Sequence, residues 1–563
     1  MSSEESNARL AEFNFQVGRH VYLSNDFTFP KLQRYMIKRE LNGYKVEEGD
    51  ETRSLIIDYL FEATSLGIFS ELYQNLEFLN LSRIIGCHNI VPSIDPRGLN
   101  ELTFLSINNC EDLECIMDAS QSPQGESGNP MMLSKLARLY MQQLPELKQI
   151  WKAPAQHVSL QTLTALSVYE CNNLTYIFSL SQTRSLVQLK SLEVSRCERL
   201  ECIVKVKFDH NEGEISVEYE NRILELSLLR NLSLGYLPEL ISFCSENYYS
   251  TWPALEKLDL RCCPNLTVNN TELEANLQYL GENLNTLDVE DCSHLRDTIP
   301  ALLKHGLKNL EELNIVEIGV QVVFQVEAII AEGQENKLFP CLESLQLEDL
   351  RELQVLLYHE GPTHNFSLQN LTDLTVRGCI KLRRLLSSTL ARNLLQLEKL
   401  YIWKCWELEQ IIDEDEDEDH LQPICFPKLT WIFVGHCPKL KYLFHISVAP
   451  SLQKLMKLEI FSNDELEEVF WDKDGAHVMD YDEIVMDELP YVSLKDLPNL
   501  TNFWPTGYQI PVPLARVCCC PKFRADSENS GAERPQTTNE EDASQEGDVS
   551  VDAREEEDDE KYD

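Results

Sequence analysis

Residues 189–203 read LKSLEVSRCERLECI, and the same pattern returns along much of the chain. Four close copies are LTFLSINNCEDLECI (102–116), LTALSVYECNNLTYI (163–177), LTDLTVRGCIKLRRL (371–385) and LEKLYIWKCWELEQI (397–411). They share the frame L-x-x-L-x-[LIV]-x-x-C-x-x-L-x-x-[IL]. Further copies begin at Leu76, Leu136, Leu229, Leu255, Leu284, Leu310, Leu342, Leu429, Leu455 and Leu489. The chain therefore repeats one unit about fifteen times, with an average spacing of about 29 residues.

The L-x-L core of this frame predicts one short strand in each unit. Alternate side chains of a strand point to the same face, so both apolar residues face inward. A single unit cannot bury that face, whereas stacked units pair their strands in parallel and share one core. We therefore predict an α/β-type solenoid, a leucine-rich-repeat horseshoe. Short parallel strands are expected on its concave face, and irregular or short-helical segments on its convex side.

The cysteine of the frame is expected to turn the chain inward at the end of each strand. Eight of the 18 cysteines occupy this position, and Asn463 replaces the cysteine in one copy. Buried cysteine behaves as a small apolar side chain, so we predict a structural role for these eight. They are Cys110, Cys171, Cys197, Cys263, Cys292, Cys379, Cys405 and Cys437.

Three parts of the chain differ in composition. Residues 1–75 hold degenerate copies of the repeat, near Leu32 to Ile37 and around Leu55 and Ile57. Residues 76–504 are the regular solenoid. From about Pro505 the frame stops, and residues 521–563 contain 16 acidic against 5 basic side chains, so 505–563 is predicted to be an acidic disordered tail. Insertions at 118–131, 204–222, 413–425 and 472–487 are predicted to be loops.

The charge balance excludes some classes of partner. The 563 residues carry 49 basic and 93 acidic side chains, a formal net charge of −44. Such a chain repels phosphate backbones and anionic lipid headgroups, so we expect neither nucleic acid nor a membrane as a partner. The beginning, MSSEESNARLAEF, lacks the basic and apolar stretches of a secretory signal. We expect a cytoplasmic protein, with the nucleus as a second location.

The motifs of common enzymes are absent from the sequence. It contains no phosphate-binding loop, no dinucleotide fingerprint, no H-E-x-x-H and no G-x-S-x-G. No C-x-x-C pair forms half of a zinc site, and the acidic run Asp413 to Asp419 lacks the glycine and ligand spacing of a calcium loop. We therefore predict a protein that is not an enzyme and has no cofactor and no metal site.

The residues between and just after the inward positions point outward, and they become aromatic in the late repeats. Adjacent strands lie about 4.8 Å apart, so these aromatic side chains should form one patch over three repeats. Clustered exposed aromatic residues are typical of protein-binding hot spots. Two interpretations stay open, namely protein binding and simple packing of the rings against each other or under a covering segment. The candidate residues are Tyr401, Trp403, Trp431, Phe433 and Phe461.

Several segments resemble a known family. They are LARLYMQQLPELKQIW (136–151), LTALSVYECNNLTYIF (163–178) and STLARNLLQLEKLYIWKCWELEQII (388–412), together with the recurring F-P-x-L start of a repeat. Over roughly residues 20–505 the chain is similar to the leucine-rich-repeat region of plant coiled-coil, nucleotide-binding, leucine-rich-repeat disease resistance proteins. The resemblance implies a sensor of pathogen effectors or of the host proteins that effectors modify.

In that family the repeats also hold a nucleotide-binding domain inactive. This chain shows no coiled-coil or nucleotide-binding motif, so the resemblance implies such a domain only as a partner, in cis or in trans. The alternative from another class is a repeat-only adaptor or scaffold, such as the substrate receptor of a ubiquitin ligase. The first 50 residues show no helical bundle that would dock a ligase core, and this disfavours the alternative.

Overall fold

The computed structural model describes most of the repeat region. The described residues are 13–17, 53–58, 66, 69–70, 72–118, 132–152, 158, 160–206, 223–245, 248–267, 276, 280, 282–304, 307–326, 339–359, 368–413, 424–472, 489–505 and 515–524. All of them belong to one unit, Met1–Arg524.

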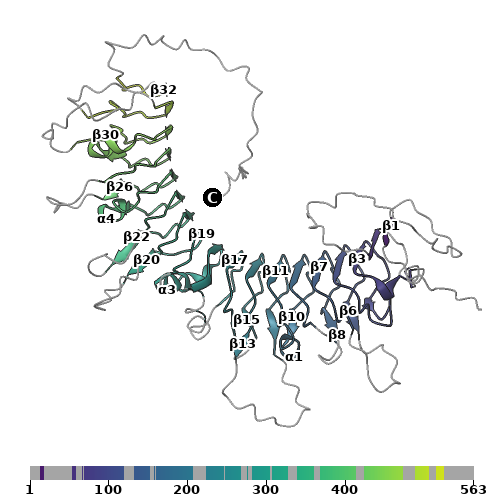
Figure 1. Ribbon diagram of the computed structural model, residues 1–563. Coiled ribbons are helices and arrows are strands. Elements are labelled where there is room, and N and C mark those ends of the chain that lie inside the picture. Colours follow the sequence, from purple (N-terminus) through teal and green to yellow (C-terminus); the bar gives the residue numbers. More distant parts are fainter. Residues whose placement is uncertain are drawn as a thin grey trace, which may run out of the picture. The chain divides into compact units, whose positions relative to one another are not determined.

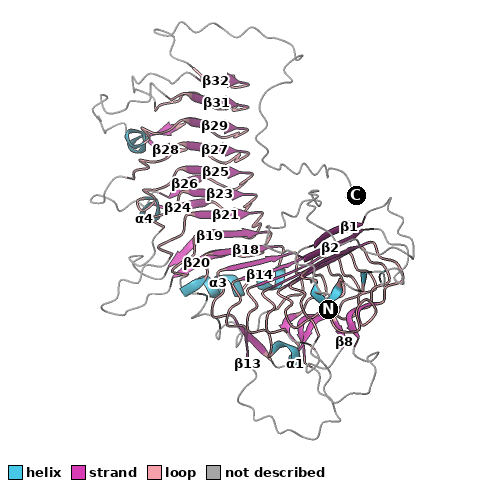
Figure 2. Ribbon diagram, turned by 45° about the vertical axis from the view of Figure 1, so that its right-hand side comes forward, coloured by secondary structure: helices cyan, strands magenta, loops and turns pink. Residues whose placement is uncertain are grey.

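The repeats form one long parallel sheet, which we call the main sheet (Figures 1 and 2). Each strand pairs in parallel with the strands of the neighbouring repeats, and the pairing is in phase from one end to the other. Its eighteen strands within the described residues are, in spatial order, β1 (Phe13–Val17), β2 (Arg53–Asp58), β3 (Phe78–Ser82), β5 (Phe104–Asn108), β7 (Arg138–Gln142), β9 (Ala165–Tyr169), β11 (Ser191–Ser195), β14 (Asn231–Gly235), β17 (Lys257–Arg261), β18 (Thr286–Glu290), β19 (Glu312–Val316), β21 (Ser344–Glu348), β23 (Asp373–Arg377), β25 (Lys399–Trp403), β27 (Trp431–Gly435), β29 (Lys457–Phe461), β31 (Tyr491–Lys495) and β32 (Ala515–Cys518).

The opposite side of the solenoid carries short strands and short helical segments (Figure 2). The short strands form separate small parallel sheets: β4 (Asn89–Val91), β6 (Cys115–Asp118) and β8 (Trp151–Lys152); β10 (Tyr176–Ser179), β12 (Cys202–Lys205) and β15 (Ser242–Cys244); β13 (Ile223–Glu225) and β16 (Tyr249–Thr251); β20 (Val322–Val326) and β22 (Val355–His359); β24 (Arg384–Ser387) and β26 (Gln410–Asp413); β28 (Phe444–His445) and β30 (Phe470–Trp471). The helical segments are α1 (Leu180–Thr183), α3 (Thr298–Lys304), α4 (Ser388–Ala391), η2 (Tyr73–Asn75), η5 (Ser293–Leu295) and η6 (Ile446–Ser451).

The hydrophobic core lies between the two sides and runs through all repeats. The second and fourth residues of the five-residue strands point into it. In β11 these are Leu192 and Val194, with 0% and 1% of their surface exposed, while the flanking Ser191 and Ser195 are half-buried. The predicted leucine-rich-repeat solenoid is therefore confirmed.

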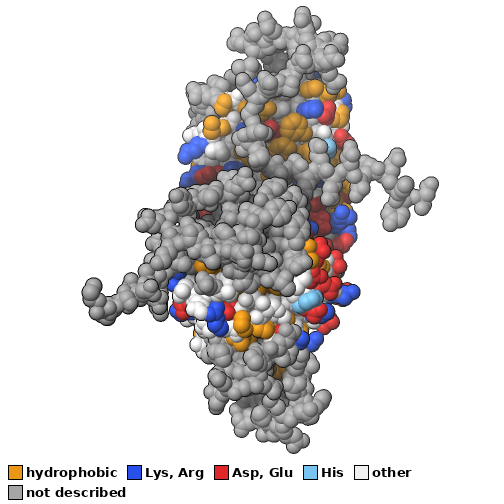
Figure 3. Space-filling model, turned by 90° about the vertical axis from the view of Figure 1, so that its right-hand side faces the viewer, with side chains coloured by type: hydrophobic (Ala, Val, Ile, Leu, Met, Phe, Trp, Pro, Cys, Tyr) orange, Lys and Arg blue, Asp and Glu red, His pale blue; other side chains and the backbone are white. Residues whose placement is uncertain are grey.

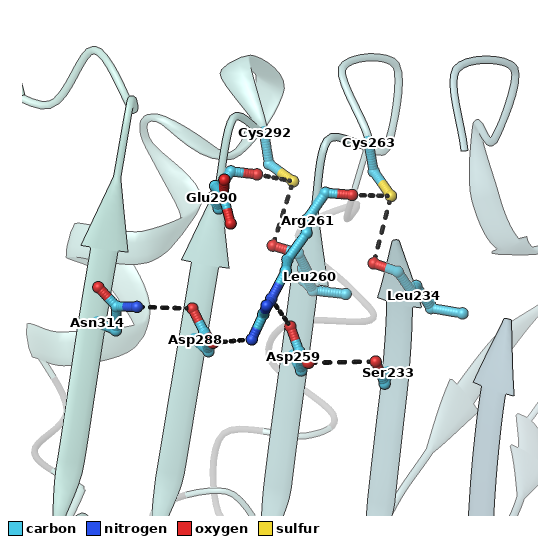
Figure 4. A network of polar contacts seen from close by, with 10 residues as sticks. All are labelled: Ser233, Leu234, Asp259, Leu260, Arg261, Cys263, Asp288, Glu290, Cys292 and Asn314. Carbon is cyan, nitrogen blue, oxygen red and sulfur yellow. Dashed lines mark hydrogen bonds and ion pairs between the residues drawn. The ribbon is translucent and has the colours of Figure 1, made fainter. Parts of the chain in front are cut away.

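Each main-sheet strand from β3 to β32 ends in the same tight turn. The residue directly after the strand has a positive φ, between 46° and 64°, and only one of these residues, Gly378, is a glycine. The left-handed residue turns the next side chain inward, which places the cysteine of the frame in the core. Cys263 Sγ donates to the carbonyl oxygens of Arg261 (3.3 Å) and Leu234 (3.5 Å), and Cys292 makes the same two kinds of contact in the next repeat (Figure 4).

Asn463 occupies the cysteine position of its repeat, as predicted, and is 0% exposed. Its Oδ1 accepts from the backbone N–H of Cys437 (2.7 Å), and its Nδ2 donates to the Val434 carbonyl oxygen (3.3 Å). Burial raises the pKa of a frame thiol such as that of Cys110 to about 11, so this thiol stays neutral. The inward cysteines and Asn463 thus tie neighbouring turns together.

The structure adds strands that the sequence did not predict. The frame does not stop at Pro505, because β32 pairs with β31 and Cys520 Sγ donates to the Leu494 carbonyl oxygen, as a frame cysteine does. The strand β1 was not predicted, whereas β2 contains the predicted Leu55 and Ile57. The copy near Leu32 to Ile37, most of the four insertions and residues 525–563 lie outside the described residues. The three-part division of the chain stays a prediction.

Candidate protein-binding surface

The first, third and fifth residues of the main-sheet strands point away from the core, and together they form what we call the outward face. The in-phase pairing places equivalent positions of neighbouring strands side by side. Tyr401 pairs with Phe433, and Trp403 pairs with Gly435, which in turn pairs with Phe461. Residues about 30 positions apart in the sequence are thereby brought into one column.

The five aromatic residues predicted from the sequence come together on β25, β27 and β29, and we call this group the aromatic patch. Tyr401 stacks on Phe433 with ring centroids 4.6 Å apart and an angle of 8° between the rings. Trp403 and Phe461 lie on either side of Phe433, at 5.4 and 5.5 Å. Trp431 completes the group at 6.3 Å from Tyr401 and 6.4 Å from Phe433. All five side chains are half-buried, so the rings pack on each other and still reach the surface.

Small and polar neighbours hold the rings in place. Gly435 leaves the space that the Trp403 ring fills, since a Cβ added at Gly435 would overlap Cζ3 and Cε3 of that ring. The His436 ring meets the Trp403 ring edge-on, with the ring centroids 4.3 Å apart and an angle of 87° between the rings. Burial lowers the pKa of His436 and raises the pKa of the Tyr401 hydroxyl, so both groups are neutral near pH 7.

Glu459 and Lys457 on β29 fix the orientation of Trp431. Trp431 Nε1 donates to Glu459 Oε2 (3.0 Å), and Lys457 Nζ lies 2.7 Å from the same oxygen. The Lys457 ammonium also lies over the Trp431 ring, 5.1 Å from its centroid. A neutral aromatic surface is thus bordered by a fixed ion pair.

The sequence reasoning missed an extension of this surface onto the last two strands. The Lys457 ammonium also lies over Tyr491, and the Arg516 guanidinium lies 5.3 Å from the same ring centroid. The signal was available, because Tyr491 occupies the first position of β31, in line with Trp431 on β27. A second aromatic group at the other end of the sheet was also missed: Phe78, Phe104 and Tyr140, stacked in sequence.

The middle of the outward face is acidic, and we call it the acidic region. Its carboxylates are Asp259, Asp288, Glu290, Glu312 and Glu348, on β17 to β21. One cation, Arg261, joins two of them: Nε donates to Asp259 Oδ1 (2.8 Å) and Nη2 to Asp288 Oδ2 (2.5 Å). Ser233 Oγ donates to Asp259 Oδ2 (3.2 Å), and Asn314 Nδ2 to Asp288 Oδ1 (3.0 Å), as Figure 4 shows.

Burial raises the pKa of the carboxyls of Asp288 and Glu290, although Arg261 acts in the opposite direction on both.

In the view of Figure 3, red Asp and Glu side chains gather along the right-hand side of the visible surface, and a group of orange hydrophobic side chains lies above them. Two regions of different chemistry therefore share one sheet.

The described residues show no built metal site and no membrane helix. No group of three or more His, Cys, Asp or Glu side chains within them could hold a metal ion. Asp413, which opens the acidic run, pairs with Arg384 at 2.9 Å, and the rest of the run lies outside the described residues. Across the same residues, no helix is long and apolar enough to cross a membrane.

Comparisons with known proteins identify the repeats. The sequence matches the family described as "Plant disease resistance protein RPS2-like, leucine-rich repeats" over residues 63–198, 254–406 and 408–516. A search of curated proteins finds no match. Among solved structures, 51 chains match.

Three of these structures are described here. The plant peptide hormone receptor RGFR1 in complex with RGF2 is 15% identical with a TM-score of 0.22, covering 82% of this chain and 86% of that chain. The TLR13–ssRNA13 complex is 13% identical with a TM-score of 0.15, covering 78% and 93%. The pneumococcal vaccine antigen PcpA is 12% identical with a TM-score of 0.14, covering 72% and 85%.

The family match covers most of the chain and agrees with the resemblance found in the sequence. Leucine-rich-repeat domains of this kind are typically non-catalytic modules that bind proteins or peptides. The chain belongs to the RPS2-like leucine-rich-repeat family of plant disease resistance proteins.

Proposed function

We propose that this chain is the protein-binding module of a plant innate immune receptor. It recognises pathogen effectors, or the host proteins that effectors modify, through the aromatic patch during a defense response. The observation that carries the proposal is the patch itself: five half-exposed aromatic side chains in mutual ring contact on three adjacent strands. Tyrosine and tryptophan are the residues that most often dominate binding energy at protein interfaces.

The ring contacts favour binding over a purely structural role. Because Tyr401, Trp403 and Phe433 already restrain each other, they lose little side-chain entropy when a partner covers them. Their remaining exposed surface is apolar, and its removal from water stabilises a complex by about 25 cal/mol per Å². A patch that served packing alone would gain nothing from this residual exposure.

The cellular setting is part of the same proposal. We place the protein in the cytoplasm, with the nucleus as a second location, where effectors and their host targets meet such receptors. A nucleotide-binding domain, supplied in cis or in trans, is a further partner. The repeats would then pass the recognition event to that domain.

A capture experiment tests the proposal. The tagged full chain is immobilised, exposed to extracts of infected plant tissue, and the bound proteins are quantified by mass spectrometry. We expect the double variant Trp403→Ala/Phe433→Ala to lose bound partners more than tenfold, since hot-spot truncations cost about 2 kcal/mol or more each. Its thermal transition should shift by only a few degrees, because the inward core is untouched.

A matched control removes two aromatic rings of similar size outside the patch. Trp406 and Tyr358 are 55% and 50% exposed and take no part in the aromatic patch. The variant Trp406→Ala/Tyr358→Ala should capture the same partners as the parent chain. Undiminished capture by the patch variant would contradict the proposal, and so would equal losses in both variants.

A further inference from the structure

The outward face changes the sign of its charge along the sheet. From β17 to β21 its strand positions carry five carboxylates and two cations, Lys257 and Arg261. From β25 to β32 they carry a single carboxylate, Glu459, and four cations. The cations are Lys399, Lys457, Lys495 and Arg516. In a chain with a net charge of −44, a cationic stretch beside the aromatic patch is a local exception.

Two of these cations are already engaged with acidic neighbours. Lys399 Nζ lies 2.7 Å from Asp373 Oδ1, and Lys457 Nζ lies 2.7 Å from Glu459 Oε2. Within each pair the positive and the negative charge neutralise each other, so little net charge remains for a ligand. They act as the fixed border of the surface.

Lys495 and Arg516 differ from the other two. Both side chains are exposed, and within the described part of the chain neither has a carboxylate at ion-pair distance. Arg516 lies against the face of the Tyr491 ring. Both cations are therefore available to an anionic group from outside.

The strand register sets the distance between these charges and the rings. Lys495 pairs with Phe461, in the column that also holds Trp403, and Arg516 lies in the column of Tyr401 and Phe433. Two strand steps, from β27 to Lys495 on β31, measure about 10 Å, and three steps, from β27 to Arg516 on β32, measure about 14 Å. At about 3.3 Å per residue, an extended peptide covers these two distances in about three and about four residues.

We infer that the aromatic patch, whose binding role rests on the proposed function, takes a protein segment that combines an apolar anchor with acidic side chains about three to four residues away. The anchor contacts the rings around Phe433, and the acidic side chains contact Lys495 and Arg516. The acidic region on the other side of the patch, with Glu348 on β21, repels a segment laid with its carboxylates in that direction. The outward face therefore selects both the sign of the charge on the bound segment and its position relative to the apolar anchor.

Selection from a random peptide display library tests this inference on the full chain. The library is selected separately on the parent chain, on the patch variant Trp403→Ala/Phe433→Ala, on Lys495→Glu/Arg516→Glu and on the control Lys308→Glu/Lys454→Glu. The last variant has the same net charge, and its two lysines are exposed in turns before β19 and β29. We expect peptides with an aromatic or aliphatic residue near Asp or Glu from the parent and the control. Reversal of the charges of Lys495 and Arg516 should lower the binding affinity of these peptides by about tenfold. Added salt should lower this affinity as well.

The outcomes separate this inference from the proposed function. Neutral or basic peptides that depend on Trp403 and Phe433, but are indifferent to Lys495→Glu/Arg516→Glu, would overturn the inference and leave the patch as a binding site. Peptides that survive Trp403→Ala/Phe433→Ala, or a selection that yields no binder, would contradict the proposed function itself. Acidic peptides that bind the parent chain, but neither the patch variant nor the charge-reversal variant, would support both the inference and the proposed function.

Discussion

The acidic region and the aromatic patch share a backbone and differ almost entirely in chemistry. Both are built from five-residue parallel strands with buried second and fourth residues, and both end in a left-handed turn followed by an inward side chain. On the outward face, however, one region joins Asp259, Arg261 and Asp288 through hydrogen bonds, and the other stacks Tyr401 on Phe433.

Under the proposed function, fold and binding depend on separate positions of the same strand. Inward residues are interchangeable between repeats because they all meet the same core. Outward residues are free to vary from repeat to repeat, since changing them leaves the core and the strand pairing intact. The chemistry of the outward face can therefore change along the sheet without a change of fold.

The largest effect should come from the inward position of the aromatic repeats. Asn463→Ala leaves the buried N–H of Cys437 without a partner, and we expect the free energy of unfolding to fall by about 2 to 3 kcal/mol. The matched change in the acidic region, Asn314→Ala, removes an outward hydrogen bond to Asp288 and should cost no more than about 1 kcal/mol. Denaturant unfolding measures both. Equal costs would contradict the division between inward and outward positions.

An intermediate effect is expected at two glycines that occupy the same fifth position of their strands. At Gly435 an added Cβ would overlap the Trp403 ring, so Gly435→Ala should displace that ring, cost about 1 to 2 kcal/mol and weaken partner binding. At Gly235 the nearest atom to an added Cβ is Ser195 Cβ, at 3.7 Å, so Gly235→Ala should be neutral. Trp fluorescence and thermal unfolding distinguish the two. A neutral Gly435→Ala would show that the patch is loosely packed.

The smallest effect is a pH dependence confined to the acidic region. Because burial raises the pKa of Asp288, the folded state binds its proton more tightly than the unfolded state. Its contribution to stability is therefore complete below the ordinary value near 3.8 and is lost as pH rises through the raised pKa. Since Asp288 is partly exposed, we expect Asp288→Asn to raise stability at pH 7 by only about 0.5 kcal/mol. A steeper fall of stability with rising pH in the variant would contradict this sign.

The strands and the patch could be predicted from the sequence for the same reason. In-phase repeats convert sequence spacing directly into spatial columns, so the frame around Leu397 and Leu429 was enough to place Tyr401 beside Phe433. The frame cysteines and Asn463 were predictable in the same way. Where the frame is weak, as in FNFQV of β1 and ARVC of β32, the strand could not be found.

Contacts that depend on side-chain direction were not predictable. The sequence shows Arg261 beside several acidic positions, but not that its guanidinium bridges Asp259 and Asp288 rather than Glu290. Nor does it show that Gly435 is the space into which Trp403 leans, because that depends on the rotamer of a ring in the neighbouring repeat. The short strands opposite the main sheet were also missed, since their two to five residues carry little periodic signal.

The central claim is that partners bind the aromatic patch and leave the acidic region uncovered. Hydroxyl-radical footprinting of the full chain, free and with a captured partner, tests it directly because aromatic rings are oxidised readily when exposed. We predict that oxidation of Tyr401, Trp403, Trp431, Phe433 and Phe461 falls in the complex, while Trp406 and Tyr358 stay unchanged. Unchanged oxidation of the five patch residues, with protection elsewhere on the chain, would contradict the claim.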